Sequence, residues 1–162
     1  MPPRFRTFKQ RGEWVELKFM AEAARRGLTV SKPHGDSARY DLAVEWDGDF
    51  SRVQVKSTGN LRWDAYWCGI STGNGKKLYT TEQVEFLAAY VIPKDAWYII
   101  PAGVVGTRLT IPLYPHRKPK LKKNRPNFEE FREAWHLLTQ PAAHGKRERR
   151  RPEDPGARKP SR

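Results

Sequence analysis

Asp41, Gln54 and Lys56 are the residues of this chain whose types and spacing best fit a catalytic centre. Gln54 and Lys56 are two positions apart in an alternating stretch, so their side chains are expected to share one face of a strand. Asp41 precedes a second alternating stretch, and an Asp-Gly pair at 47–48 between the two stretches favours a β-hairpin. In a hairpin paired in register, Asp41 lies beside the other two near the strand end. Oxygen ligands beside a lysine are what metal-dependent hydrolysis of a phosphodiester needs.

An amphipathic helix is expected before the hairpin, over residues 12–27, with Gly27 at its C-terminal end. Glu16 lies on this helix. A short strand over residues 28–31 and a loop then lead into the hairpin. The apolar residues that recur at helical spacing, and so are expected to face the core, are Trp14, Leu17, Met20, Ala21, Ala24 and Leu28.

Further strands and helices are predicted downstream of the hairpin. Thr80 or Thr81 is a suitable N-cap for one helix, and Asn127 for another. The order of helices and strands fits an α/β core. The predicted elements are a third core strand over 65–71, a helix over 81–89, strands at 91–92 and 97–100 around a turn at 93–95, an edge strand over 104–113 and a last helix over 127–139.

The ordered set of motifs resembles the core of the PD-(D/E)XK nuclease superfamily. It is most similar to the variant with Gln-x-Lys in place of Asp/Glu-x-Lys, which occurs in some group I intron homing endonucleases. The resemblance covers roughly residues 8–114 and departs from the family pattern twice: Tyr40 replaces a proline, and the amide of Gln54 replaces an acid. The segments that carry the resemblance are Gly12–Leu17, Pro33–Asp36, Arg39–Leu42, Arg52–Ser57, Glu82–Val91 and Ala96–Pro101.

The resemblance implies a fold, an activity and a set of site residues. The fold is α/β, a restriction-endonuclease-like core whose mixed central β-sheet is flanked by helices and followed by a basic C-terminal extension. The activity is that of a metal-dependent DNA endonuclease of the homing or restriction type, a hydrolase with Mg²⁺ or Mn²⁺ as cofactor. The implied catalytic residues are Glu16, Asp41, Gln54 and Lys56, and the implied metal ligands are Asp41, Gln54, the backbone carbonyl of Val55, and Glu16.

Individual roles within this set stay open at the level of sequence. Glu16 either binds a second metal ion or holds a coordinated water, and Lys56 either orients the attacking water or stabilises charge on phosphorus. Each residue also has a purely structural interpretation, with Asp41 as a turn cap, Glu16 as a surface acid, and Gln54 and Lys56 as solvated strand residues. Because Gln54 is neutral, a catalytically inactive DNA-binding protein that retains the nuclease fold is the alternative function. A third hypothesis, an RNA-binding or ribosome-associated protein, rests on charge alone.

The net charge of +13 is concentrated outside the predicted core. Residues 116–126 carry six Lys or Arg and no acid, and residues 141–162 carry a net charge of +5. Such segments favour polyanions, and the resemblance implies that the polyanion is DNA, which we expect to be double-stranded. We expect a nuclease-like core over 1–115, a basic linker and C-terminal helix over 116–140, and a disordered basic tail over 141–162. The candidate nucleic-acid-binding residues are Arg11, Ser57, Arg62, Lys76, Lys77, Lys120, Lys122 and Lys123.

Cysteine usage and hydropathy bound the remaining classes. The lone Cys68 excludes an internal disulfide and a cysteine-rich zinc site, and we expect it to pack in the core. No apolar run reaches about 18 residues and no signal-peptide pattern is visible, so we expect a cytoplasmic protein without a membrane span. Each chain would carry one site, so cutting both strands of a duplex favours a homo-oligomer.

Overall fold

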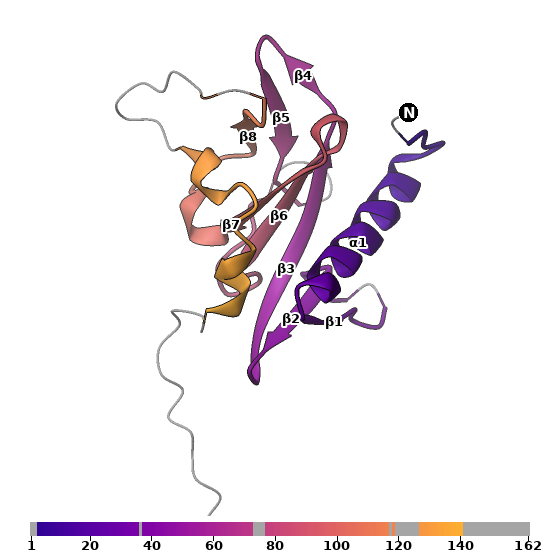
Figure 1. Cartoon of the computed structure of the whole chain (residues 1–162), viewed down its shortest axis with the longest axis vertical. Coiled ribbons are helices and arrows are strands. Elements are labelled where there is room, and N and C mark those ends of the chain that lie inside the picture. The colour runs from indigo at the N-terminus through magenta and orange to yellow at the C-terminus, as the bar shows by residue number, and fades with distance from the viewer. Residues whose placement is uncertain (1–2, 36, 73–76, 117, 119–126, 141–162) are drawn as a thin grey trace, which may run out of the picture.

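The computed structural model describes residues 3–35, 37–72, 77–116, 118 and 127–140 (Figure 1). A five-stranded sheet, in the order β1-β2-β3-β6-β7, forms its centre. The β3–β6 pair is parallel and the other neighbours are antiparallel, which confirms the predicted mixed sheet. Among the described residues, no helix has the combined length and hydrophobicity needed to cross a membrane. The strands are β1 (Thr29–Ser31), β2 (Leu42–Trp46), β3 (Asp49–Thr58), β6 (Phe86–Val91) and β7 (Ala96–Pro101).

The predicted hairpin is formed by β2 and β3. Asp47 and Gly48 have φ angles of 50° and 79°, the positive values that a two-residue turn of the favoured type requires at both central positions. This turn sets the register, in which Leu42 pairs with Val53 and Trp46 pairs with Asp49. The prediction of a hairpin with an Asp-Gly turn is therefore confirmed.

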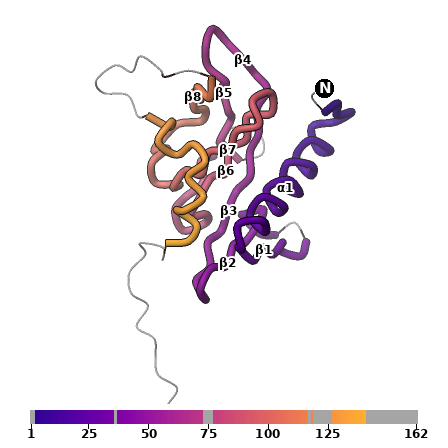
Figure 2. The backbone as a smooth tube through the Cα atoms, viewed as in Figure 1, coloured from indigo at the N-terminus to yellow at the C-terminus, as the bar shows by residue number. Residues whose placement is uncertain are grey.

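Layers of chain cover the two faces of the central sheet (Figures 1 and 2), and each layer forms a buried apolar cluster with it. The helix α1 (Phe8–Arg25) and the short 3₁₀ helix η4 (Trp135–Thr139) pack on one face, where Phe19 contacts both Trp97 and Trp135. A three-stranded sheet packs on the other face and contributes Cys68 and Ile111 to a second buried cluster. The strands of this smaller sheet are β4 (Leu61–Arg62), β5 (Ala65–Gly69) and β8 (Thr110–Leu113).

The helix α1 ends close to the predicted position, starts earlier than predicted and buries only part of the predicted apolar face. Of the residues predicted to face the core, Leu28 is buried and Trp14 and Met20 pack against the core, whereas Ala21 and Ala24 are exposed. The Thr7 side chain accepts a hydrogen bond from the Gln10 amide, which places the N-cap earlier than the predicted start at residue 12. Gly27, with φ of 80°, follows the helix as expected. The fully buried residues are Val15, Phe19 and Ala23, whereas Leu17 is 65% exposed. Two overlapping apolar stripes run along this helix, and packing against the sheet selects the one that repeats every four residues.

The predicted helix over 81–89 is wrong, because residues 81–83 form a turn and residues 86–89 belong to β6. All six residues of β6 are buried, since the strand lies between β3 and β7 and is covered on both faces. A strand buried on both faces loses the alternation of apolar and polar residues, so its sequence resembles that of a buried helix. The turn that follows is formed by the 3₁₀ helix η1 (Ile92–Lys94), as expected near residues 93–95.

The segment predicted as a third core strand is β5, which belongs to the smaller sheet and not to the central one. Its partner β8 covers only the end of the predicted edge strand over 104–113. The 3₁₀ helix η2 (Ala102–Val104) and a turn at Gly106, with φ of 58°, precede it. Cys68 is fully buried in this sheet, which confirms that it packs in the core.

The predicted helix over 127–139 is replaced by two 3₁₀ helices, η3 (Phe128–Phe131) and η4. Between them, the Glu133 amide donates to the Trp97 carbonyl at 2.8 Å, and the Trp97 amide donates to the Glu133 carboxylate at 2.7 Å. The edge strand β7 thus obtains partners for its free backbone groups, and the helix is interrupted. The predicted Asn127 cap is present and accepts from the Glu129 amide.

Candidate active site

Hydrogen bonds hold the Asp41 carboxylate beside β3, the strand that carries the catalytic candidates Gln54 and Lys56. Asp41 directly precedes β2, and continuing the β2–β3 register places it opposite Gln54. Its Oδ2 atom accepts a hydrogen bond from the Val55 amide at 2.8 Å and another from the Gln54 side-chain Nε2. The Asp41 amide donates to the Val53 carbonyl at 3.1 Å. The structure therefore confirms that the hairpin brings Asp41 beside Gln54.

Burial raises the pKa of the Asp41 carboxyl, and the nearby Glu16 carboxylate raises it further. The hydrogen bonds from Val55 and Gln54 and the charge of Lys56 act in the opposite direction without cancelling the rise. The ionised form of Asp41 is thus incompletely compensated by the protein. A cation bound at this carboxylate would supply the missing compensation.

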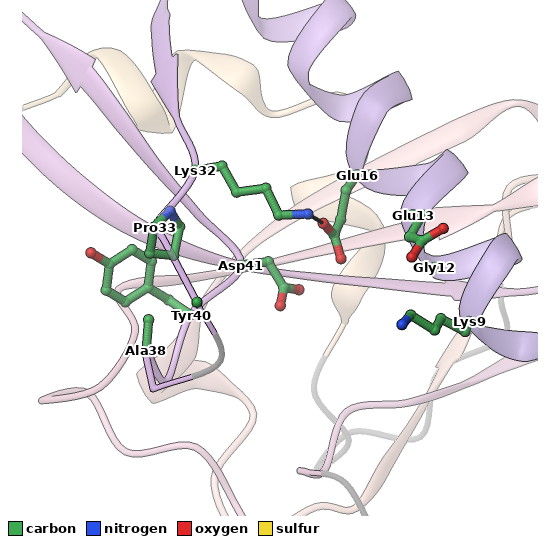
Figure 3. A pocket seen from close by; sticks show the side chains of 10 residues that line it. Lys9, Gly12, Glu13, Glu16, Lys32, Pro33, Ala38, Tyr40 and Asp41 are labelled. Atoms are coloured by element: carbon green, nitrogen blue, oxygen red, sulfur yellow. Dashed lines mark hydrogen bonds and ion pairs between the residues drawn. The ribbon is translucent and has the colours of Figure 1, made fainter.

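Glu16 and Asp41 share an open cleft of about 500 Å³ between α1 and the loop that precedes β2 (Figure 3). We call it the carboxylate cleft. Lys32 reaches across it, and its Nζ atom lies 2.7 Å from the Glu16 Oε2 atom. The Glu16 side chain is 19% exposed and the Lys32 side chain 56% exposed. The residues that line the carboxylate cleft are Lys9, Gly12, Glu13, Glu16, Lys32, Pro33, Gly35, Ala38, Tyr40 and Asp41.

A second cleft of about 320 Å³ lies along the other side of α1, and we call it the basic cleft. Lys56 borders it, and its Nζ atom also lies 5.2 Å from the centre of the Tyr79 ring. Gln54 and Lys56 pair with Leu87 and Ala89, which belong to the cluster opposite α1, so these two side chains share a face as predicted. The residues that line the basic cleft are Phe8, Arg11, Gly12, Val15, Val55, Lys56, Ser57 and Gly69.

The donor atoms around Asp41 fit a hard divalent cation. Asp41 and Glu16 offer carboxylate oxygens and Gln54 offers an amide oxygen, which is the ligand type that Mg²⁺ and Mn²⁺ prefer. Gln54 is buried, with 7% of its surface exposed, although it is polar. Within the described part of the chain, no three His, Cys, Asp or Glu side chains are grouped as for a metal ion. Gln54 is one reason for this absence, because an acid at position 54 would add a second carboxylate next to Asp41.

The structure places four of the predicted nucleic-acid-binding residues. Arg11 and Ser57 line the basic cleft, and the Arg11 guanidinium stacks over the Phe8 ring at 5.1 Å. Arg62 lies on β4 beside Trp63, whose side chain is 91% exposed. Lys77 is exposed and pairs with Thr72 in an isolated bridge. Lys76, Lys120, Lys122 and Lys123 lie outside the described residues, as does the predicted tail over 141–162.

Lys32 and Gly12 belong to the site but were not among the sequence candidates. Lys32 directly follows the short strand β1, and its position beside Glu16 depends on how α1 packs across that strand. Gly12 lines both clefts, so the α1 backbone at this position separates them. The sequence indicates only their positions, one just after a predicted strand and one inside a predicted helix. Neither a lysine nor a glycine at such a position predicts a functional site.

Comparison with known proteins gives one family and two solved structures. A family model described as PD-(D/E)XK endonuclease matches residues 6–138. A bacterial homing endonuclease, I-Ssp6803I, is 27% identical with a TM-score of 0.67, covering 85% of this chain and 94% of its own. The Holliday junction resolvase Hjc of Archaeoglobus fulgidus is 17% identical with a TM-score of 0.46, covering 64% and 84% respectively. Curated protein sequences give no match.

Proposed function

The chain belongs to the PD-(D/E)XK endonuclease family, and from this premise we propose that it cleaves double-stranded DNA with a divalent metal ion, Mg²⁺ or Mn²⁺. The observation that carries the proposal is the convergence of Asp41, Gln54 and Lys56 at one end of the β2–β3 hairpin, with Glu16 in the adjoining cleft. The similarity to a homing endonuclease over 85% of this chain supports a homing-type enzyme.

Asp41 and Gln54 would hold the metal ion, and the Val55 carbonyl is a further candidate ligand. A bound divalent ion supplies Lewis acidity and lowers the pKa of a coordinated water. Asp41 is suited to this role because the Val55 amide and the Gln54 side chain fix its orientation, while its burial leaves its charge in need of a cation. Gln54 adds an oxygen donor without adding a negative charge.

Lys56 would act on the reacting phosphate. Its ammonium borders the basic cleft and interacts with the Asp41 charge, so it lies between the metal ligands and the surface that would receive DNA. From there it stabilises the negative charge that grows on the phosphorus oxygens during attack. Arg11 and Ser57, which line the same cleft, would bind the neighbouring phosphates.

We further propose that the active species is a homo-oligomer. A chain with one such centre cuts one strand per binding event, so two copies related by symmetry would cut both strands of a duplex. Sedimentation equilibrium of the full chain, with and without DNA, measures the mass of the assembly. A monomer under both conditions contradicts this part of the proposal.

An inactive DNA-binding protein is the second candidate, and one observation favours it. Gln54 leaves the described residues without the grouped acids that many metal sites use. Such a protein would bind DNA with equal affinity in the presence and absence of divalent ions. It would also be indifferent to a change at Lys56 apart from a modest loss of affinity.

Cleavage of supercoiled plasmid carrying a target from randomised-site selection separates the two candidates. We expect nicking or linearisation with Mg²⁺ or Mn²⁺ and none with chelator. Lys56→Ala should lower the rate by about a hundredfold or more, because it removes transition-state charge stabilisation. Lys94→Ala, at an exposed lysine of η1 that lines neither cleft, is the matched control and should cleave normally. Binding to the selected target without cleavage in either metal would instead establish the inactive binder.

A further inference from the structure

The side chain of Lys32 places a positive charge inside the carboxylate cleft. Lys32 extends from the end of β1 to Glu16 on α1, and the 2.7 Å contact is the only side-chain interaction drawn between the two walls of the cleft in Figure 3. The hydrogen bond to Glu16 raises the pKa of Lys32, and the charges of Asp41 and Glu13 act in the same direction. The ammonium therefore contacts Glu16 directly and is attracted by the charges of Asp41 and Glu13.

The charge balance of this cleft favours a single divalent ion. Glu13, Glu16 and Asp41 face the ammonium groups of Lys9 and Lys32, which leaves one net negative charge among the lining residues. One divalent ion converts this into one net positive charge, which matches the single negative charge of a phosphodiester. A second divalent ion would leave three net positive charges in a partly desolvated site, where like charges repel strongly.

We propose that Lys32 takes the place of a second metal ion, holding Glu16 as an internal counter-ion so that the centre works with one divalent cation at Asp41. This inference rests on the proposed function. Glu16 then acts through Lys32 and through its repulsion of the Asp41 charge, and it is not a resident metal ligand. Lys32 is a positioning residue, since it touches Glu16 and not the reacting phosphate.

The proposal is tested by counting bound Mn²⁺ on the full chain, using the electron paramagnetic resonance signal of the free ion. We expect wild type to bind one Mn²⁺ per chain. Lys32→Met, which keeps an unbranched side chain one atom shorter than lysine but removes its charge, should bind two, because Glu16 becomes available. Lys32→Arg, the matched control, should bind one. The Lys32→Met and Glu16→Gln double variant should return to one. Because Lys32 is half exposed, these changes should leave the thermal unfolding midpoint nearly unaltered.

The outcomes distinguish this inference from the proposed function. Two Mn²⁺ ions per wild-type chain, or one ion in Lys32→Met with an unaltered thermal midpoint, would overturn the role of Lys32 while leaving a metal-dependent nuclease intact. No Mn²⁺ bound to wild type, together with cleavage that is insensitive to chelator, would overturn both.

Discussion

The two clefts beside α1 differ sharply in charge although they share a wall at Gly12. The carboxylate cleft contains three acids and two lysines, whereas the described lining of the basic cleft contains Arg11 and Lys56 and no acid. They meet again at Val55, whose amide donates to Asp41 while the residue itself lines the basic cleft. A short stretch of β3 therefore serves both.

This separation assigns a different task to each side of the helix. A site rich in carboxylates attracts cations, and a site with uncompensated basic groups attracts phosphate. If both functions occupied one cleft, the lysines would compete with the metal ion for the acids. The α1 backbone keeps the two groups of charges apart. Of the two lysines among the described residues of the carboxylate cleft, Lys32 is the one in direct contact with a carboxylate. The predictions below each alter one side and ask whether the other responds.

Asp41→Asn should have the largest effect, and it should be confined to the carboxylate cleft. Cleavage should fall by about a thousandfold or more, since Asp41 is the principal anionic ligand in the proposed metal site. Mn²⁺ binding should be lost, and DNA binding measured by gel shift should persist. Because folding raises the pKa of Asp41, its ionised form is destabilising at neutral pH, so the thermal midpoint should stay the same or rise. A fall of several degrees would mean that Asp41 is chiefly structural.

Glu85→Ala should destabilise the pairing of β3 with β6, and β3 both lines the basic cleft and donates a hydrogen bond to Asp41 of the carboxylate cleft. Glu85 accepts from the Arg52 amide at 2.6 Å and from its guanidinium, at the start of the β3–β6 pairing. The side chain is only 11% exposed, and its loss should cost about 2 kcal/mol of unfolding free energy. Glu22→Ala, which removes the ion pairs with Arg25 and Arg26 near the end of α1, is the more exposed control and should cost less than about 1 kcal/mol. Equal costs would contradict the structural role of Glu85.

The stabilisation that Glu85 provides should decrease as the pH falls. Burial alone would raise the pKa of Glu85, but its hydrogen bonds with Arg52 outweigh burial and lower the pKa below its ordinary value of 4.5. The stabilisation is therefore complete above that value and disappears as the pH falls through the lower folded pKa. The difference between wild type and Glu85→Ala in chemical denaturation should shrink over this acidic range. A difference that grows with acidification would contradict the assignment.

The part of the site that the sequence predicts is the part that local geometry determines. The Asp-Gly turn fixes the register of the hairpin and so places Asp41 beside Gln54. The two-residue period then puts Gln54 and Lys56 on the same face of β3. The end of α1 is likewise local, because Gly27 provides the positive φ angle. The central mixed sheet and the nuclease family were predicted from the ordered set of motifs to which this hairpin belongs.

The parts that sequence did not predict depend on contacts between distant segments. Lys32 meets Glu16 only because α1 crosses β1 in the folded chain. The strand β6 has the composition of a buried helix until its parallel pairing with β3 is known. The interruption at Glu133 arises because the free edge of β7 needs partners. None of these features has a periodic or turn pattern of its own.

Arg11→Ala should alter the basic cleft alone. We expect DNA affinity to fall about tenfold and the slope of affinity against salt to decrease by about one, as for a lost phosphate contact. Mn²⁺ binding should remain unchanged, because Arg11 is absent from the lining of the carboxylate cleft. Arg25→Ala, in the last turn of the same helix, is the matched control and should bind DNA normally. Parallel losses in both variants would mean that charge, and not the cleft, controls affinity.

Gly12→Ala should change the binding affinities least of all these variants. It tests the part of the α1 backbone that separates the two clefts. A Cβ atom at Gly12 meets no atom within 4 Å, so alanine fits and should stabilise the helix by about 1 kcal/mol. Mn²⁺ and DNA affinities should change by no more than about twofold. Gly12→Gln extends a longer side chain from the wall that both clefts share, so it should weaken both affinities together.

The comparison between these two variants carries the argument, because helix propensity favours both over glycine while only glutamine has the reach to enter the clefts. Ala21→Gln, at an exposed position further along α1, controls for the added amide and should leave both affinities unchanged. If Gly12→Gln weakened DNA binding alone, the carboxylate cleft would not extend to the wall at Gly12. If it weakened neither, the clefts would be independent, and the charge separation would owe nothing to the helix backbone between them.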